Sequence, residues 1–177
     1  YIDNLETHYK DSPEHIFKDA LQLEKDFQKE LLHKKGNENI HKLHNELSEI
    51  MIRHVTVKRN NKKLQETLDK IHKIRDRYQN IQLDDQGKML NQTYIFAHQF
   101  KAMLELAIVI TQGALLRDEF RGAHFKEGFM ERDDKNWLKT TIAEYDSEKR
   151  EPIISYEPVD TRHLEPIKRS YKKIKRY

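Results

Sequence analysis

The chain has 177 residues, a length that fits one domain, or one domain with an appendage. Hydrophobic and charged residues each make up 36% of it, as expected of slender helices that each bury one apolar stripe. Five glycines and four prolines argue against a β-sandwich or a disordered chain. The net charge of +3, from 33 basic and 30 acidic side chains, is too even for a domain that binds nucleic acid with its whole surface. The absence of cysteine excludes disulfides, thiolate metal sites and thiol nucleophiles, and favours a reducing compartment.

No signal peptide is visible and the chain starts at Tyr1 rather than Met, so we expect a fragment of a longer protein. Residues 1–11 show no sustained period and are expected to be a linker from a preceding domain. Ser12 and Pro13 predict a helix start, with serine as the N-cap and proline at the first helical position. The helix is expected to end before Gly36, which can turn left-handed. Its apolar face is expected to be core: Ile16, Ala20, Leu23, Phe27 and Leu31.

Three further helices are expected from apolar residues at three- and four-residue steps. They span about 37–54, 64–81 and Gln92–Phe120, with a break at 54–61 and a polar turn at 82–91. The last is apolar on nearly every side and should lie at the centre of the bundle. Its apolar run, Met103–Leu116, is short of the ~20 residues that cross a bilayer and contains Glu105, which indicates a buried helix.

After Phe120 the period changes to an alternation typical of strands. Residues 137–143 and the stretch PIISYEPV (152–159) flank the turn-like DSEKRE, which predicts a small hairpin followed by an extended basic tail. The predicted fold is mainly α: an up-and-down helical bundle of spectrin-repeat type with a small C-terminal β-hairpin and an extended tail. We expect the bundle at 12–120, and at 121–177 a segment that carries the motif Arg-Gly-Ala-His, the hairpin and the tail.

Two clusters of polar residues could indicate a metal site and a catalytic acid–base pair, but a structural role explains each of them more simply. His41 and His44 share a helix face, but zinc needs three or four converging ligands and nothing nearby completes the set, so we expect no metal site. The acids Glu131, Asp133 and Asp134 are neutralised by neighbouring Arg132 and Lys135 in the sequence. A local capping cluster is therefore favoured over an acid–base pair.

The tail IKRSYKKIKRY (167–177) interleaves basic residues with Tyr171 and Tyr177, a pattern that suits single-stranded nucleic acid. A charged terminus kept soluble by its lysines is the commoner explanation.

The stretch "RGAH", Arg121–His124, also has two explanations. Gly122 can end the long helix in a left-handed conformation while Arg121 and His124 complement the negative pole of its dipole; alternatively, the planar guanidinium recognises a carboxylate, a phosphate or a flavin carbonyl.

Several motifs in the second half resemble the C-terminal domain of the succinate dehydrogenase and fumarate reductase flavoprotein subunits, with the menaquinone-linked succinate dehydrogenases most similar. The long apolar helix runs into Arg-Gly-Ala-His (121–124), then Glu-Arg-Asp-Asp (131–134), Trp-Leu-Lys (137–139) and Arg-Ser-Tyr (169–171). The connection around Arg59 also resembles the family's second-to-third helix connection. Met130 departs from it, because proline is common there, and the extension KKIKRY has no assigned role.

The resemblance implies part of an enzyme that oxidises succinate to fumarate with covalently held FAD and passes electrons to an iron–sulfur subunit and then to quinone. It implies that the FAD-binding and capping domains lie upstream, so we expect no catalytic residue here and no FAD binding or turnover by the isolated chain. By motif, Arg121, Gly122, His124 and Arg169 are expected to support flavin attachment.

The resemblance further implies contacts with the upstream domains, the iron–sulfur subunit and, through the complex, a membrane anchor subunit, with no nucleic acid as a partner. The implied location is peripheral, at the cytoplasmic face of the bacterial inner membrane. The alternative is a free-standing helical interaction module whose basic tail binds nucleic acid or a membrane surface.

Overall fold

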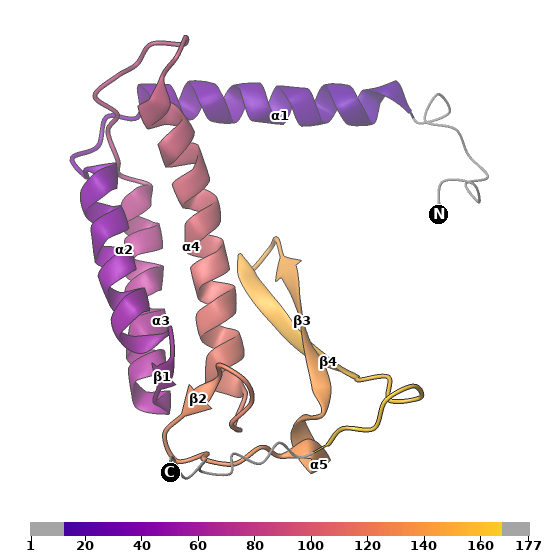
Figure 1. The fold of residues 1–177 in the computed structure, drawn as a ribbon. Helices are drawn as coiled ribbons and strands as arrows, with labels where there is room; N and C mark the ends of the chain where they lie inside the picture. The colour runs from indigo at the N-terminus through magenta and orange to yellow at the C-terminus, as the bar shows by residue number, and fades with distance from the viewer. Residues whose placement is uncertain (1–12, 168–177) are drawn as a thin grey trace, which may run out of the picture.

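The computed structural model describes residues 13–167, in which three long helices stand side by side and a fourth lies across one end of them (Figure 1). The three upright helices are α2 (Ile40–His54), α3 (Asn61–Tyr78) and α4 (Gln92–Leu116), and the crossing helix is α1 (Glu14–His33). The predicted class, a mainly α bundle with a small hairpin, is confirmed. The expected linker at 1–11 and the Ser12 cap lie outside the described residues, and Pro13 holds the N-cap position of α1 without a side-chain hydrogen bond.

Smaller elements follow the end of α4 and join the bundle to a hairpin. Strands β1 (Lys58–Arg59) and β2 (Phe125–Lys126) pair in parallel, and the four-residue helix α5 (Asp134–Trp137) comes next. The antiparallel hairpin of β3 (Lys139–Asp146) and β4 (Glu151–Pro158) then stands beside α4. The hairpin was predicted from its alternation; the β1–β2 pair was not, because two residues show no period.

Each upright helix begins at an asparagine. The side-chain oxygens of Asn39, Asn60 and Asn91 accept hydrogen bonds from backbone N–H groups in the first turns of α2, α3 and α4. Such caps satisfy donors that a helix start leaves free, and each contributes about 1 kcal/mol. The caps therefore fix where the three helices start and how their apolar faces are phased.

The core lies between these three helices and the last turns of α1. Tyr78 and Phe100 are its largest buried apolar side chains, and the Tyr78 hydroxyl donates to the carbonyl of Ala97 at 3.0 Å. The main core residues are fully or almost fully buried: Leu31, Leu32, Ile40, Leu43, Leu64, Ile71, Ile81, Leu83, Leu104 and Ile108.

Three expectations from the apolar pattern were wrong. The apolar run of the fourth helix is not buried on every side, because Leu106 and Ile110 are 60% and 51% exposed. The helix predicted to reach Phe120 ends at Leu116, because Arg117 takes an extended conformation with φ −97° and ψ 104°. In the first helix only the C-terminal turns are buried. Ile16 and Leu23, expected in the core, are 53% and 72% exposed, because α1 projects beyond the bundle (Figure 1).

Gly36 does not turn left-handed, yet the fold requires a glycine there. Backbone hydrogen bonds between 36–38 and 80–82 hold these two connections together, including Glu38 N–H to the Asn80 carbonyl at 3.0 Å. A Cβ atom on Gly36 would lie 1.7 Å from the Asn80 carbonyl oxygen. The close approach of two backbones therefore explains this glycine.

We predict that Gly36→Ala lowers the free energy of unfolding by at least about 2 kcal/mol, because a backbone clash cannot relax by side-chain rotation. Gly113→Ala is the matched control, since a Cβ in that turn of α4 meets nothing within 4 Å. It should be neutral or stabilise by up to about 1 kcal/mol through helix propensity. Urea unfolding followed by circular dichroism measures both, and equal stability of the two variants would contradict the assignment.

Candidate functional site

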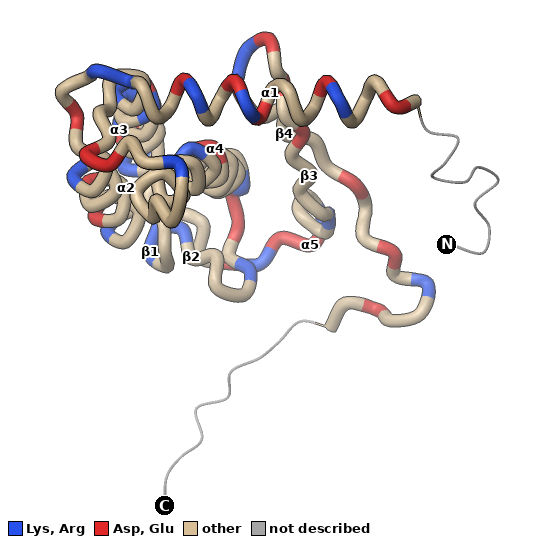
Figure 2. Tube along the Cα trace, turned by 90° about the horizontal axis from the view of Figure 1, so that it is seen from above, with Lys and Arg blue, Asp and Glu red and all other residues tan. Residues whose placement is uncertain are grey.

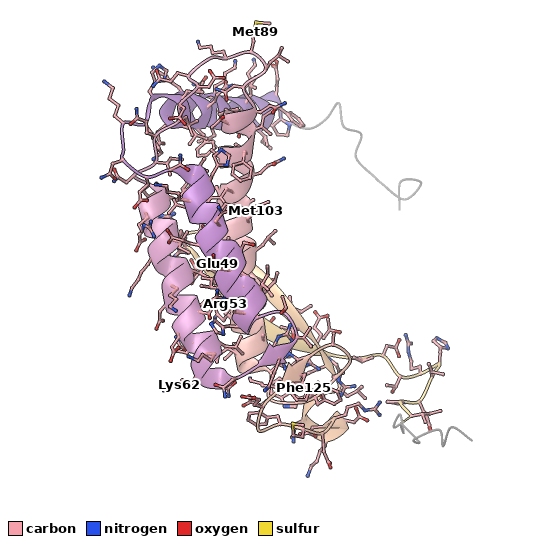
Figure 3. The ribbon with its side chains drawn as sticks, turned by 60° about the vertical axis from the view of Figure 1, so that its left-hand side comes forward. Glu49, Arg53, Lys62, Met89, Met103 and Phe125 are labelled. Atoms are coloured by element: carbon pink, nitrogen blue, oxygen red, sulfur yellow. The ribbon has the colours of Figure 1, made fainter. Side chains whose placement is uncertain are left out.

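The segment after α4, residues 117–137, gathers most of the buried charge of the described chain. It leaves α4, turns at Arg121–His124, pairs through β2 with β1 and returns along 131–134 to α5. Figure 3 shows it at the foot of the bundle, around the labelled Phe125 and near Lys62. Glu119 and Lys126, both in this segment, are at most 1% exposed.

Lys126 closes the carbonyl end of α4. Its ammonium group donates to the carbonyls of Ala114, Leu115 and Arg117 at 3.0, 2.7 and 3.2 Å, and to Asp118 Oδ1 at 2.7 Å. These are carbonyls that the last turn of a helix leaves without partners, and a cation there also complements the helix dipole. Burial lowers the pKa of Lys126, and the hydrogen bond to Asp118 opposes that shift.

His124 links this segment to the end of α2. Its Nε2 lies 2.9 Å from the carbonyl oxygen of Arg117, so Nε2 carries the proton and donates. Its Nδ1 then accepts from Arg59, whose other guanidinium nitrogens donate to the carbonyls of Val55 and Thr56 beyond α2. Burial first, and then the positive charges of Arg59 and Lys126, lower the pKa of His124.

A buried carboxylate, Glu119, organises the arginines around it. Its Oε1 accepts from Nε of Arg117 and Nε of Arg121, each at 2.8 Å, and its Oε2 accepts from the backbone N–H of Asp133 at 3.2 Å. Burial alone raises the pKa of Glu119, but the hydrogen bonds from Arg121 and Arg117 outweigh it and hold the pKa below its usual value. Glu119 is therefore a fixed negative charge.

Arg117 joins this cluster to the hairpin. Its guanidinium donates to the carbonyls of Trp137 at 2.6 Å and Lys139 at 3.1 Å, and lies 5.4 Å from the centre of the Trp137 ring. The hairpin is also held from the other side, because Arg75 of α3 donates to the Arg150 carbonyl at 2.6 Å.

Two carboxylates, Glu119 and Asp134, hold the guanidinium of Arg121 in place. Besides Glu119, it donates from Nη2 to Asp134 Oδ1 at 2.7 Å, and Arg132 donates to the other Asp134 oxygen. Arg132 also donates to the carbonyl of Ile167 at 3.0 Å. About a quarter of the Arg121 side chain, 28%, stays exposed. The guanidinium is therefore fixed in position and still partly open to what lies outside this chain.

The structure places three of the four predicted supporting residues in one tight turn. Backbone N–H groups of Arg121 and His124 donate to each other's carbonyls at 3.1 and 2.9 Å, and Gly122 has φ +59°. The left-handed glycine was predicted; a Cβ there would meet nothing, so the conformation and not close approach favours glycine. Arg169 lies outside the described residues.

The expected role of this turn in the helix dipole needs correction. Because α4 ends at Leu116, Arg121 is five residues beyond the helix and bonds carboxylates rather than helix carbonyls. His124 reaches only the carbonyl of the C-cap residue Arg117. The cation at the helix end is Lys126, which the apolar pattern did not identify.

The other candidate residues make local contacts. Asp133 caps α5 by accepting from the N–H of Asn136 at 3.1 Å, although Asp134 pairs with arginines instead. His41 stacks on Phe96 with ring centroids 5.0 Å apart, and His44 contacts the same ring edge-on. Within residues 13–167 no three histidine or carboxylate side chains converge as metal ligands.

Sequence reasoning missed Arg117, Glu119 and Lys126, and the only available signal was local. Three charged residues, Arg117 to Glu119, directly follow an apolar helix, where a polar group is expected to satisfy the last carbonyls. Nothing in the spacing shows that the group is Lys126, ten residues beyond the helix.

We predict that Lys126→Met, which keeps an unbranched apolar stem but removes the ammonium group, destabilises the protein by about 1–3 kcal/mol, because it leaves carbonyls of α4 without donors. Lys62→Met is the control, since Lys62 is an exposed lysine near the same end of the bundle (Figure 3) and should change stability by less than about 0.5 kcal/mol. Thermal melts of both variants measure this, and an unaffected Lys126→Met would contradict the capping role.

We predict that the His124 ring titrates below the ordinary value of about 6.5. Its lowered pKa means that the unfolded chain binds the proton first as pH falls below that value, so His124 makes stability decrease there. NMR titration of the ring measures the pKa, and the decrease should be smaller in His124→Gln. A midpoint at or above 6.5 would contradict the neutral, Nε2-protonated ring.

With this geometry established, comparisons with known proteins identify the family. The family described as "Fumarate reductase flavoprotein C-term" matches residues 44–171, more than half of the chain. The succinate dehydrogenase flavoprotein subunit of Bacillus subtilis is 41% identical over 175 residues, which are 99% of this chain and 30% of that protein. The fumarate reductase flavoprotein subunit of Helicobacter pylori strain J99 is 38% identical over 79% of this chain and 20% of its own length.

Solved structures agree. A chain of the quinol fumarate reductase of E. coli superposes with a TM-score of 0.84 at 27% identity, covering 89% of this chain and 27% of that one. A Mycobacterium smegmatis Sdh1 chain, at 23% identity and a TM-score of 0.71, shares the fold over 89% of this chain and 26% of its own length. The chain thus spans less than a third of the relatives it matches, and it belongs to the family of C-terminal domains of succinate dehydrogenase and fumarate reductase flavoprotein subunits.

Proposed function

We propose that this chain is the C-terminal part of a flavoprotein subunit that oxidises succinate to fumarate and passes electrons to an iron–sulfur subunit and then to quinone. The observation that carries this proposal is the match to the Bacillus subtilis succinate dehydrogenase flavoprotein subunit over 99% of the chain. The matches to the Helicobacter pylori fumarate reductase subunits cover 79%. The more complete match makes the succinate dehydrogenase flavoprotein the basis of this proposal.

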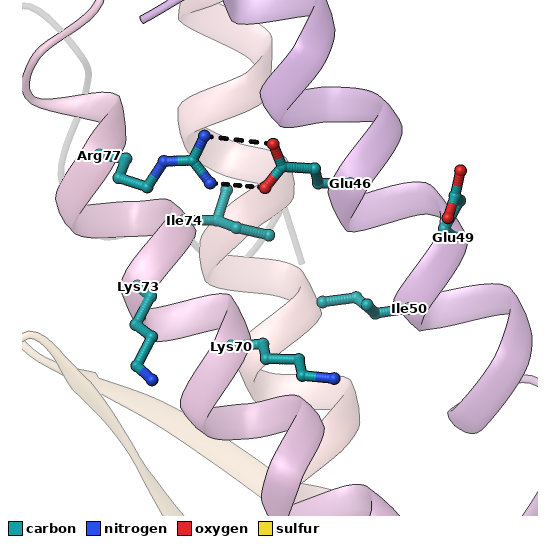
Figure 4. Close-up of a pocket in the computed structure, with 7 residues that line it drawn as sticks. All are labelled: Glu46, Glu49, Ile50, Lys70, Lys73, Ile74 and Arg77. Carbon is teal, nitrogen blue, oxygen red and sulfur yellow. Dashed lines mark hydrogen bonds and ion pairs between the residues drawn. The ribbon is translucent and has the colours of Figure 1, made fainter.

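We infer that FAD is not held by the described residues alone. One groove lies between α2 and α3, has about 260 Å³, and is lined by charged side chains and two isoleucines (Figure 4). Ligand pockets for molecules smaller than FAD already need about 300–1,000 Å³. FAD would therefore be held by the part of the flavoprotein that this chain does not contain, and Arg121, Gly122, His124 and Arg169 would support that site from outside.

The geometry around Arg121 suits such a supporting role. Glu119 and Asp134 fix the guanidinium, and the double hydrogen bond across the turn fixes its backbone. A guanidinium stays charged at any working pH, and a preorganised charge acts on a neighbouring site without reorganising. We infer that Arg121 presents a fixed positive charge to the flavin-bearing part of the protein.

The remaining assignments follow from the same proposal. Residues 1–11 would link to the FAD-binding domain, and 12–120 would form the bundle. Residues 121–177 would hold a motif that faces the flavin domain, the small hairpin and the basic tail. The partners would be the upstream domains, the iron–sulfur subunit and, through the complex, a membrane anchor subunit. The location would be peripheral, at the cytoplasmic face of the bacterial inner membrane. The free-standing interaction module is not favoured, because the family match covers most of the chain; its tail, Lys172–Tyr177, lies outside the described residues.

We predict that Arg121→Ala or Arg121→Lys in the full-length subunit strongly reduces covalent flavin and succinate oxidation while the helices stay folded. Alanine removes the charge, and lysine keeps it but cannot reproduce the planar bidentate contacts. Flavin fluorescence of the denatured subunit in a gel, beside a thermal melt of the same variant, measures both effects.

Arg132→Ala is the matched control, because Arg132 binds the same Asp134 as Arg121 without contacting Glu119. If it retains flavin while Arg121→Ala loses it, the effect belongs to Arg121 rather than to a loosened loop. Equal loss in both variants assigns the role to the loop, and normal flavinylation in a stable Arg121→Ala protein leaves the turn a structural feature only.

A further inference from the structure

The exposed half of α1 carries an apolar face with no partner among the described residues. Ile16, Ala20 and Leu23 are exposed, yet they follow each other at the spacing of a buried helix face. Their face continues into Phe27, which does have a partner: its ring packs edge-on against His98 of α4 at 5.2 Å. The face is therefore partly buried where α4 passes and exposed in the half of α1 that projects beyond α4 (Figures 1 and 2).

A second exposed face runs along α4. Ile95, Leu106 and Ile110 are 52%, 60% and 51% exposed and lie in line at helical spacing, with Gln99 and Ala102 between the first two. At Gly113 an added side chain would meet only open space. The lysine and the glutamate of α4 point elsewhere: Lys101 lies 4.1 Å from the centre of the Phe27 ring, and Glu105 lies 3.6 Å from Arg75. Five turns of this face are therefore without charge.

The two apolar faces lie on either side of the point where α1 crosses α4. A small groove at this crossing is lined by Ile95 together with Glu24, Tyr94, His98 and Gln99, and His98 Nε2 lies 3.2 Å from a carboxylate oxygen of Glu24. We call the two exposed apolar faces, with this polar groove between them, the α1–α4 surface. Its apolar residues are Ile16, Ala20, Leu23, Ile95, Leu106 and Ile110. Exposed apolar patches mark interaction sites rather than ordinary protein surface.

We propose that the α1–α4 surface is where this chain docks onto the rest of its own flavoprotein polypeptide, through an apolar and uncharged face of the partner domain. The inference rests on the proposed function and specifies which face makes the contact. Its support is the regular apolar spacing of α1, which is typical of a helix with two buried halves, and the length of the Bacillus subtilis relative, of which the match spans only 30%.

A membrane and a second copy of this chain fit the α1–α4 surface less well. α4 is, among residues 13–167, the one helix apolar and long enough to cross a membrane by length and composition, and 33% of that stretch is buried. Helices that lie on a membrane, however, carry lysines and arginines along the polar face beside the apolar one. The only lysine of α4 is held over Phe27, and α1 alternates acidic and basic residues (Figure 2). A second copy would have to match a bent, one-sided surface to itself.

The absence of cysteine allows a direct test. Leu23→Cys and Leu106→Cys place a thiol on the two arms of the surface, and Ile52→Cys, at a 64% exposed position on α2, is the matched control. Each variant is made in the 177-residue chain and in the full-length subunit. Mass spectrometry then measures the rate at which maleimide labels the peptide that contains the introduced cysteine. We expect similar rates in the chain alone, and in the full-length subunit a slowing of about tenfold or more at 23 and 106 but not at 52.

Unchanged rates at 23 and 106 in a full-length subunit that contains flavin would overturn this docking surface and leave the proposed function intact. Loss of the proposed function appears separately, as a full-length subunit without flavin. Slowing in the 177-residue chain on addition of phosphatidylglycerol vesicles would assign the surface to lipid. Slowing that increases with the concentration of the chain would assign it to a second copy, and either result overturns the proposal.

Discussion

A helix leaves its last carbonyl groups without hydrogen-bond donors. In this protein a buried lysine donates to these carbonyls at the end of α4. Lys126 binds three of these carbonyls and Asp118, so the chain after α4 must return to the helix end before it can go on. That return makes the turn at Arg121–His124 and the short strand β2, which pairs with β1 beyond α2. One ammonium group thereby fixes the path of the segment that carries the candidate site.

The buried carboxylate of Glu119 fixes the positions of two arginines next to this segment. Glu119 is buried and binds Arg117 and Arg121, so the side chain that holds the hairpin and the side chain proposed to face the flavin share one carboxylate. Removing one partner of a buried ion pair generally costs more than the pair contributes, because a buried charge stays behind. The arginines therefore stay in fixed positions relative to α4. We infer that this rigidity lets a domain without a cofactor pocket influence a cofactor held elsewhere.

Much of the architecture could be predicted from periodicity alone, and the exceptions have physical causes. Leu43, Ile71 and Phe100 lie on apolar stripes, and stripes determine which face is buried. Periodicity did not locate the end of α4, because Phe120 keeps the helical spacing. It could not find Lys126, whose partners are distant in sequence, or the reason for Gly36, which is the nearness of Asn80. It correctly identified the face of α1 that carries Leu23 as apolar, but a pattern does not say what covers a face.

If this chain is an integral part of a longer flavoprotein, as we propose, its native form must be both larger and coloured. The decisive measurement is to isolate, from its native cells, the polypeptide that contains the sequence RGAHFKEGFMERDD, and to determine its intact mass together with its visible absorption. We expect a single polypeptide several times the 21.4 kDa of this chain, with the absorption of a covalently bound flavin that survives denaturation. A colourless species close to 21.4 kDa, folded and stable by itself, would contradict the proposal.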